Sequence, residues 1–178
     1  MTSTDWKVRR VHPELDAETW RDARLDALRV APTAFASLHS EWEKKPLREV
    51  SAWLNRANHF AAFAKGRALG IIAWSQIAYP AGRHRAQVLN VYVRPEARGQ
   101  GIGDALIEAV VRHAEKHVLQ LELGVTADNP AALALYQRHG FREIGRLPRG
   151  YHHADGFRDE ILMLRPLDGP KDAAAQHP

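Results

Sequence analysis

Cysteine is absent from the sequence, which excludes disulfide bonds, thiolate metal sites and a cysteine nucleophile. Long apolar runs are absent too, since no stretch approaches the ~18 uncharged apolar residues of a membrane-spanning helix. The segment from Met1 to Arg10 also lacks the apolar core of a signal peptide. These absences predict a cytoplasmic protein that has no membrane partner.

A strong charge of one sign is also missing. The 178 residues carry a formal net charge of +4, and the basic residues are interleaved with acidic ones rather than clustered. This distribution is not that of a nucleic-acid-binding surface, so no nucleic acid is expected as a partner. A mild excess of positive charge suits a small anionic ligand equally well.

The length and an apolar content of 45% suit one globular domain of ordinary size. No linker or repeat divides the chain, and we therefore assign residues 1–167 to a single domain. Residues 168–178 are polar and rich in alanine and proline, which predicts a flexible C-terminal tail.

Apolar periodicity and turn residues predict an order of elements that begins and ends with strands. The expected strands span residues 6–11, 59–65, 68–78, 85–93, 118–126, 141–147 and 157–167. The expected helices span residues 14–30, 46–57, 104–117 and 129–139, and a loop at 148–156 joins the last two strands. This order predicts an α+β (mixed α/β) fold, whose twisted, mostly antiparallel sheet has about six or seven strands flanked by about four helices.

The segment Val88–Asp104 combines three features that together favour anion binding. Its first part is an apolar run typical of a strand, Gly99, Gly101 and Gly103 follow in a tight turn, and a helical pattern begins directly after them. Glycine lets backbone N–H groups approach a ligand closely, and a helix N-terminus adds a partial positive charge. The expected ligand is a phosphate or pyrophosphate.

Two common phosphate-binding motifs do not fit this segment. A Walker loop requires Lys-Ser or Lys-Thr after its last glycine, and neither follows Gly103. A dinucleotide fingerprint requires Gly-x-Gly-x-x-Gly near the start of a βαβ unit. Here the loop lies mid-chain, and its fixed residues are Arg98, Gly101 and Gly103.

These three residues resemble the acyl-CoA-binding motif of the GNAT superfamily of N-acyltransferases, Arg/Gln-x-x-Gly-x-Gly/Ala. A second GNAT pattern, Asn-x-x-Ala-x-x-Leu-Tyr-x-x-x-Gly-Phe, is matched from Asn129 to Phe141. Asn129 suits a helix N-cap and Gly140 suits the end of that helix. The resemblance extends over roughly residues 62–164.

The resemblance implies the GNAT fold, in which two strands splay apart to form a V-shaped cofactor cleft. It implies acetyl-CoA as the co-substrate and, because many relatives are dimers, a homodimer. No metal is expected, because His113 and His117 have helical spacing but no third ligand in the sequence. The residues that the resemblance assigns to acetyl-CoA are Val91, Tyr92, Val93, Arg98, Gly99, Gln100, Gly101, Ile102, Gly103, Asp104, Asn129 and Tyr136.

Acetyl transfer to an amine needs a base for the amine, a donor for the oxyanion and an acid for the departing thiolate. The resemblance puts Tyr136 at the position of the acid. It also puts a backbone N–H of the strand Val91–Val93 beside the acetyl carbonyl.

The general base is less clearly marked in the sequence. Some relatives carry a glutamate five residues before the asparagine of the second motif, where this chain has Gly124. Glu122 lies two residues earlier on the same strand face and is the predicted carboxylate base. The alternatives are His152, His153 and a chain of water molecules without a single base.

In relatives, the acceptor is held by the first two helices, their connecting loop and the loop before the last strand. The residues expected to contact it here are Phe35, Glu41, His152 and Asp155. The predicted function is direct transfer, within a ternary complex, of the acetyl group of acetyl-CoA to a primary amine of a small molecule such as an amino acid, a polyamine or an antibiotic-like amine. Two alternatives stay open: a protein N-terminal or lysine acetyltransferase, and a non-catalytic acyl-CoA-binding regulatory module.

Overall fold

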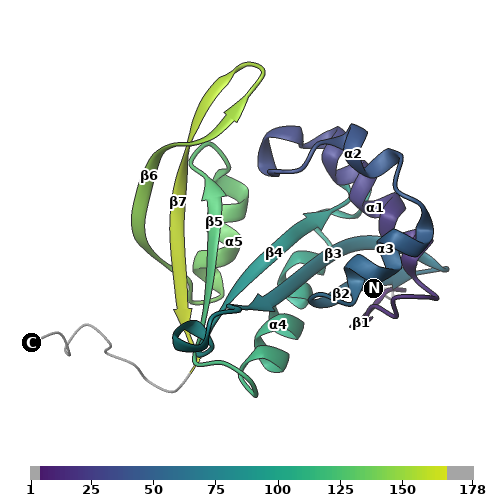
Figure 1. Cartoon of the computed structure of the whole chain (residues 1–178), viewed down its shortest axis with the longest axis horizontal. Coiled ribbons are helices and arrows are strands. Elements are labelled where there is room, and N and C mark those ends of the chain that lie inside the picture. The colour runs from purple at the N-terminus through teal and green to yellow at the C-terminus, as the bar shows by residue number, and fades with distance from the viewer. Residues whose placement is uncertain (1–4, 168–178) are drawn as a thin grey trace, which may run out of the picture.

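The computed structural model describes residues 5–167, which form one mixed sheet of seven strands with helices on both faces (Figure 1). The strands lie in the spatial order β1-β2-β3-β4-β5-β7-β6. Neighbouring strands are antiparallel except β4 and β5, which run parallel. Their bounds are β1 (Lys7–Arg10), β2 (Asn58–Ala64), β3 (Arg67–Gln76), β4 (Arg85–Val93), β5 (Gln120–Thr126), β6 (Arg142–His153) and β7 (Gly156–Pro166).

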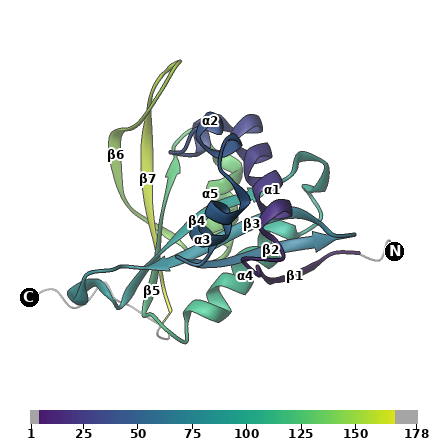
Figure 2. The same cartoon turned by 45° about the vertical axis from the view of Figure 1, so that its right-hand side comes forward.

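Five α-helices connect the strands within the described residues, together with the 3-10 turns η1 (Pro32–Ala34), η2 (Pro80–Gly82) and η3 (Pro95–Ala97). The helices are α1 (Ala17–Val30), α2 (His39–Glu43), α3 (Leu47–Leu54), α4 (Ile102–Ala114) and α5 (Pro130–Arg138). Helices α1–α3 pack on one face of the sheet, and α4 and α5 pack on the other (Figure 2). No helix within residues 5–167 is both long enough and apolar enough to cross a membrane.

Strands β4 and β5 pair at only three positions, Arg85–Gln87 with Gln120–Glu122. Beyond them, residues 88–93 of β4 and 123–126 of β5 run apart, and Figure 1 shows the two strands meeting near the bottom and separating upward. We call these two segments the β4–β5 splay. Because β5 pairs with β7 along its whole length, the sheet stays continuous while its centre opens. The expected α+β fold with a V-shaped opening is confirmed.

A bulge at Asn90 changes the direction of the β4 side chains. Ala86 and Val88 face the core beneath α4 before the bulge, and Val91 and Val93 face it afterwards. The register against β3 slips at the same point, and Asn90 adopts a positive φ of 58°. Asparagine tolerates this conformation better than most residues, and a bulge bends the strand that contains it. The bulge therefore accompanies the departure of β4 from β5.

The two faces of the sheet carry different cores. Ile102, Leu106 and Val110 recur at helical spacing along α4 and are at most 1% exposed, as expected for an amphipathic helix. The core beneath α1–α3 is aromatic instead. Its three tryptophans have ring centroids 5.0–5.5 Å apart and come from three helices: Trp20, Trp42 and Trp53.

The C-terminal hairpin differs from the loop expected at 148–156. Strand β6 continues to His153 and β7 begins at Gly156, which leaves a two-residue turn. Within β6, residues 148–150 form a bulge opposite Asp159, and the N–H of Arg149 donates to the Asp159 carboxylate at 3.0 Å. Proline and glycine in this bulge gave the sequence the appearance of a loop.

The first helix also begins later than expected. Helix α1 starts at Ala17 rather than at residue 14, because the Asp16 carboxylate accepts hydrogen bonds from Arg9 and from the N–H of His12 and so holds a turn ahead of the helix. Leu15 lies in this turn and is 80% exposed. The tail predicted at 168–178 lies outside the described residues.

A buried ion-pair network fastens α1 to the sheet beside the splay. The Arg94 side chain is 3% exposed, and its guanidinium lies 2.5 Å from Asp22 and 3.2 Å from Asp26. The Tyr92 hydroxyl also donates to Asp26, at 2.7 Å. Burial alone would raise the pKa of Asp26, but the hydrogen bonds it accepts and the charge of Arg94 outweigh burial and lower it.

Replacing Arg94 should destabilise the fold much more than replacing an exposed arginine. We expect Arg94→Ala to lower the free energy of unfolding by about 3 kcal/mol, because it leaves a buried carboxylate without its cation. Urea denaturation measures this loss. Arg67→Ala is the control, because it removes the ion pair to Glu96, which is about half exposed at both ends, and should cost less than about 1 kcal/mol. Equal losses in the two variants would contradict the buried network.

Candidate active site

The loop before α4 has the conformation that its glycines permit. Gly99 and Gly101 adopt φ of 73° and 78°, values that other residues rarely take. Gly101 is the N-cap of α4, and its carbonyl accepts from the N–H of Ala105 at 3.0 Å. The N–H groups of residues 102–104 therefore have no acceptor within the helix. Together with the positive end of the helix dipole, they form a site for an anion.

Gly103 has a different structural role. A Cβ at this position would lie 3.3 Å from the Leu135 Cδ2 atom on α5. The glycine therefore lets α4 and α5 pack closely, which holds the second motif next to the loop.

Strand β4 presents a free edge to the splay. The N–H of Arg94 donates to the Leu69 carbonyl on β3 at 2.9 Å. Because successive N–H groups of a strand alternate in direction, the N–H of Val93 points to the opposite edge, where β5 no longer pairs. The carbonyl of Val93 accepts from the Arg98 Nε atom at 3.1 Å. The Val93 N–H is thus a main-chain donor without a strand partner.

The side chain of Tyr92 points away from the splay. It is 5% exposed, packs in the core beneath α1–α3 and donates its hydroxyl to Asp26. The assignment of Tyr92 to acetyl-CoA binding stays a prediction, and its side chain is engaged in the core beneath α1–α3. The alternation of the strand directs Tyr92 to the face opposite Val91 and Val93.

The start of α4 is tied to the end of α5 by charged side chains. Asp104 lies 3.0 Å from both the Arg138 guanidinium and the His139 Nε2 atom. Burial alone would raise the pKa of Asp104, but the hydrogen bonds to His139 and Arg138 lower it. Gln100, also predicted to contact the ligand, is exposed and donates to a backbone carbonyl of the preceding turn.

Helix α5 presents the remaining residues of the second motif. The Asn129 side chain accepts from the N–H of Ala132 at 3.1 Å and so caps the helix. Tyr136 is 6% exposed and lies edge-on to Phe141. Burial, and to a smaller extent the neighbouring Tyr151, raises the pKa of Tyr136 above the usual value of about 10. The phenol is therefore protonated at neutral pH and can act as a proton donor.

Glu122, the predicted base, lies at the closed end of the splay. It stands opposite Gln87, in the last pair that joins β4 and β5. Its Oε1 atom accepts from Gln120 at 2.7 Å and lies 3.4 Å from the Arg85 Nε atom. The role of Glu122 as base stays a prediction, but an engaged carboxylate at this position is poorly suited to it.

Two of the predicted acceptor-binding residues follow α1. The ring of Phe35 packs against the Arg24 guanidinium, whose central carbon lies 4.7 Å from the ring centroid. The Glu41 carboxylate accepts a hydrogen bond from the N–H of Leu38 at 3.1 Å, at the start of α2. The turn η1 just before Phe35 contacts β5. This segment therefore reaches from α1 across to the other side of the splay.

The other two acceptor-binding candidates lie at the tip of the β6–β7 hairpin (Figure 1). The His152 ring stacks on Phe157 with centroids 4.5 Å apart. Asp155 forms an ion pair with Arg158. Both side chains are thus engaged within the hairpin, and Glu41 is engaged within α2.

Sequence reasoning missed Tyr151 and Glu160 in the same hairpin. The Tyr151 hydroxyl donates to the Glu160 Oε1 atom at 2.9 Å. Tyr151 was assigned to a loop, and nothing distinguished Glu160 from the other charged residues of the last strand. Only the pairing of β7 with β5, which sets Glu160 opposite Thr126, brings it beside the splay.

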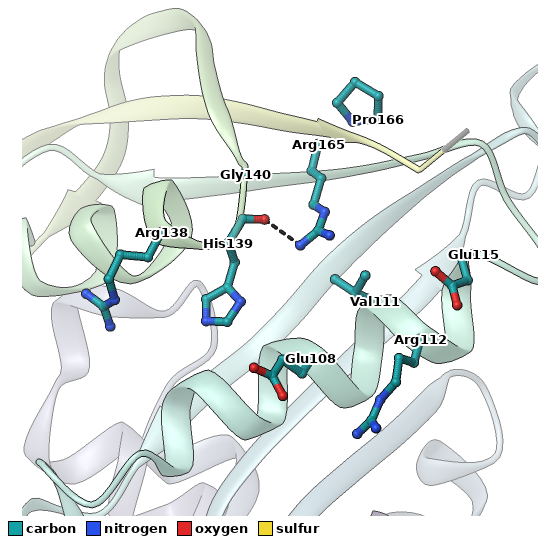
Figure 3. A pocket seen from close by; sticks show the side chains of 9 residues that line it. All are labelled: Glu108, Val111, Arg112, Glu115, Arg138, His139, Gly140, Arg165 and Pro166. Atoms are coloured by element: carbon teal, nitrogen blue, oxygen red, sulfur yellow. Dashed lines mark hydrogen bonds between the residues drawn. The ribbon is translucent and has the colours of Figure 1, made fainter. Parts of the chain in front are cut away.

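A hollow of about 680 Å³ lies between α4, the end of α5 and β7 (Figure 3). Its lining carries both signs of charge, and Arg165 donates to the His139 carbonyl across one side of it. No residue of the splay lines it, so it is a separate feature. Through Arg138 and His139, the partners of Asp104, it adjoins the glycine loop.

His113 and His117 are engaged in aromatic packing. Their rings lie 5.0 Å apart, and both contact Trp74. Within residues 5–167, no group of three or more histidine, aspartate or glutamate side chains is arranged to hold a metal ion.

Comparison with known proteins connects this geometry to a family. The model of the acetyltransferase (GNAT) family matches residues 18–141. This range contains the glycine loop, the strands of the splay and the helix that carries Tyr136.

Two curated relatives and one solved structure add detail. Mycothiol acetyltransferase of Geodermatophilus obscurus is 35% identical over 144 residues, which cover 76% of this chain and 44% of the relative. Ribosomal protein bS18-alanine N-acetyltransferase of Escherichia coli K12 is 40% identical over 83 residues, which cover 46% of this chain and 56% of the relative. The chain thus spans about half the length of these curated relatives. The Salmonella typhimurium protein yncA, solved with its cofactor acetyl-CoA, shares the fold with a TM-score of 0.81 at 16% identity, over 97% of this chain and 100% of that chain.

Substitution of Gly101 should abolish anion binding at the loop. We expect Gly101→Glu to weaken coenzyme A binding at least about tenfold, because a carboxylate would stand at the helix N-terminus where the phosphates are expected to bind. Isothermal titration calorimetry measures this affinity. Gly66→Glu is a matched control, since Gly66 has a similar φ of 76°, equally open space around its Cβ position, and lies outside the glycine loop, in the turn between β2 and β3. Normal binding by Gly101→Glu, or equal weakening in both variants, would contradict the assignment of the loop.

Proposed function

The chain belongs to the acetyltransferase (GNAT) family, and from this premise we propose that it transfers the acetyl group of acetyl-CoA to a primary amine of a small molecule. One observation carries the proposal. A glycine loop at a helix N-terminus directly follows a strand whose outer edge the splay leaves free. A phosphate site in line with an open strand edge suits an extended molecule that has a phosphate at one end.

The residues around the splay fit the parts of acetyl-CoA. The N–H groups of residues 102–104 would hold the pyrophosphate, and the pantetheine arm would lie along the free edge of β4. The N–H of Val93 is the donor available to the thioester carbonyl, whose oxygen gains negative charge when the amine attacks. The presence of acetyl-CoA in yncA, a protein of the same fold, supports this choice of co-substrate.

Tyr136 is the proposed acid for the leaving group. Its phenol is buried and protonated, and a proton given to the sulfur allows coenzyme A to leave as a thiol rather than as a thiolate. Asn129 acts indirectly, because its cap fixes the start of the helix that carries Tyr136.

The pKa of the acceptor amine determines how much free energy its deprotonation costs. A lysine-type amine, with a pKa of about 10.4, costs about 4–5 kcal/mol to neutralise at pH 7. An α-amino group with a pKa near 8 costs roughly 1–1.5 kcal/mol. A single carboxylate base therefore suffices more readily for an α-amine than for a lysine.

The relatives support two kinds of acceptor. Mycothiol acetyltransferase, by its name, acts on a small molecule, and its match covers more of this chain than that of the other relative. The name of the second relative indicates the α-amine of an alanine in a ribosomal protein. Acetylation of a protein N-terminus is therefore the second candidate function.

Acetyl-CoA-dependent thiol release tests the proposal directly. Cell extract is divided by dialysis, and the dialysable and retained fractions are supplied separately as acceptors. We expect release with the dialysable fraction, and mass spectrometry of the product then identifies the amine. Release with only the retained fraction would favour the protein acceptor. No release with either fraction, while acetyl-CoA still binds, would overturn the catalytic proposal in favour of a binding module.

Removal of the Tyr136 hydroxyl should slow turnover without affecting cofactor binding. We expect Tyr136→Phe to lower kcat about 100-fold, because protonation of the leaving thiolate is lost while the buried ring still packs. Steady-state kinetics and the Kd for acetyl-CoA measure the two effects separately. Tyr79→Phe is the control, because it removes a hydroxyl from an exposed tyrosine outside the splay, whose hydrogen-bond donor is Arg85. An unchanged kcat in Tyr136→Phe would remove its role as acid.

A further inference from the structure

A carboxylate from β7 fills the space that a side chain at position 124 would occupy. A Cβ built on Gly124 would lie 1.8 Å from the Glu160 Oε1 atom, so the two cannot coexist without movement. On the other side of Glu160, a Cβ built on Gly150 would lie 2.6 Å from the Glu160 Cβ atom. Glycines on both flanking strands thus leave room for this one glutamate.

This carboxylate lies on the acceptor side of the sheet. Ile161 and Met163 face the core beneath α4 and α5, so Glu160, which alternates with them along β7, faces the opposite side. That side is the one covered by α1–α3 in the other half of the sheet, and η1 reaches across it to β5. Gly124 belongs to the splayed part of β5, so Glu160 stands beside the open part of the splay.

Glu160 is less engaged than the carboxylates around it. Glu122, on the same face, is held by Arg85 and Gln120. Asp128, Asp155 and Asp159 each form an ion pair with an arginine, at 2.9, 2.5 and 2.9 Å, respectively. Within residues 5–167, the hydrogen bond from Tyr151 is the only one that the Glu160 side chain accepts. One carboxylate oxygen therefore remains free to accept a proton.

Tyr151 is a neighbour of both Glu160 and the proposed acid. Burial, together with the hydrogen bond to Glu160, raises the pKa of Tyr151 to about 12, so the phenol keeps its proton and donates to the carboxylate. The same phenol contributes to the raised pKa of Tyr136, which makes the two tyrosines electrostatic neighbours. Tyr151 therefore hydrogen-bonds Glu160 and is close enough to Tyr136 to influence its pKa.

We propose that Glu160 is the general base of the reaction, taking the proton of the acceptor ammonium directly or through one water molecule. This inference rests on the proposed acetyl transfer. Loss of the proton to Glu160 leaves a neutral amine, whose nitrogen forms a bond to the thioester carbon. When the carbon–sulfur bond breaks, the electron pair leaves with the sulfur, which takes the proton of Tyr136. The second proton of the nitrogen restores the phenol, and the proton on Glu160 passes to solvent.

Glu160→Gln tests the base by its dependence on pH. With the dialysable extract fraction as acceptor, we expect turnover at pH 7 to fall about 100-fold while the Kd for acetyl-CoA is unchanged. The deficit should shrink as the pH rises, because more of the amine is then already neutral in solution. Glu143→Gln makes the same chemical change at an exposed position of the same hairpin and should keep full activity.

Moving the carboxylate between strands provides a second test. Glu160→Ala should lose activity as Glu160→Gln does. Adding Gly124→Glu to Glu160→Ala returns a carboxylate to the same face of the sheet from β5, and turnover should recover at least about tenfold. Gly124→Ala alone should reduce turnover, because its Cβ displaces the Glu160 carboxylate. Circular dichroism and acetyl-CoA binding confirm that each variant is folded.

The outcomes separate the two proposals. Wild-type protein that binds acetyl-CoA but releases no thiol would overturn the acetyl transfer and the role of Glu160 with it. An active wild type with an equally active Glu160→Gln would overturn only the assignment of the base, as would a deficit that does not change with pH. A large loss in Glu122→Gln and none in Glu160→Gln would return the role to Glu122.

Discussion

The early end of pairing between β4 and β5 is the constraint on which the site depends. The two strands share three residue pairs, after which β4 bends at the Asn90 bulge and β5 follows β7. Adjacent strands normally satisfy the main-chain groups of one another, so their separation leaves donors such as the N–H of Val93 unpaired. An extended ligand can use these donors, and the glycine loop begins near the end of the same strand. The proposed phosphate site and the proposed acyl site are thereby aligned by one departure from regular sheet structure.

Glycine is required for three different steric reasons around the β4–β5 splay. At Gly101 the backbone needs a positive φ to begin α4. At Gly103 the side chain is missing so that α4 can approach Leu135 of α5. At Gly124 the missing side chain leaves room for a glutamate from the next strand. The last case shows how a carboxylate can be supplied to one place in a sheet from a neighbouring strand, since side chains on one face of adjacent strands lie within reach of each other.

Aromatic packing around a buried histidine and a buried arginine holds α1–α3 on their face of the sheet. Trp20, Trp42 and Trp53 meet from three helices, and the His59 ring lies 4.8 Å from Trp53. Burial lowers the pKa of His59 to about 4, so this ring is neutral at physiological pH, and burial also lowers the pKa of Arg24 to about 10. This packing holds α1 and the turn η1 that follows it, and η1 contacts β5. Aromatic packing and the ion pairs of Arg94 therefore both support the site.

The sequence by itself determined most of the elements, the glycine loop and the capped helix from Asn129, because caps, turns and apolar periodicity depend on residues close together along the chain. It also pointed to the phenol of Tyr136 through a short motif. The tertiary structure alone decided which carboxylate stands at the opening. Glu122 and Glu160 look alike in the sequence, and they differ in their neighbours on adjacent strands. The neighbours of Glu160 on β6 depend on the bulge at residues 148–150, a segment that the sequence predicted to be a loop. Cross-strand neighbours depend on register, and register is set by the whole sheet rather than by the local sequence.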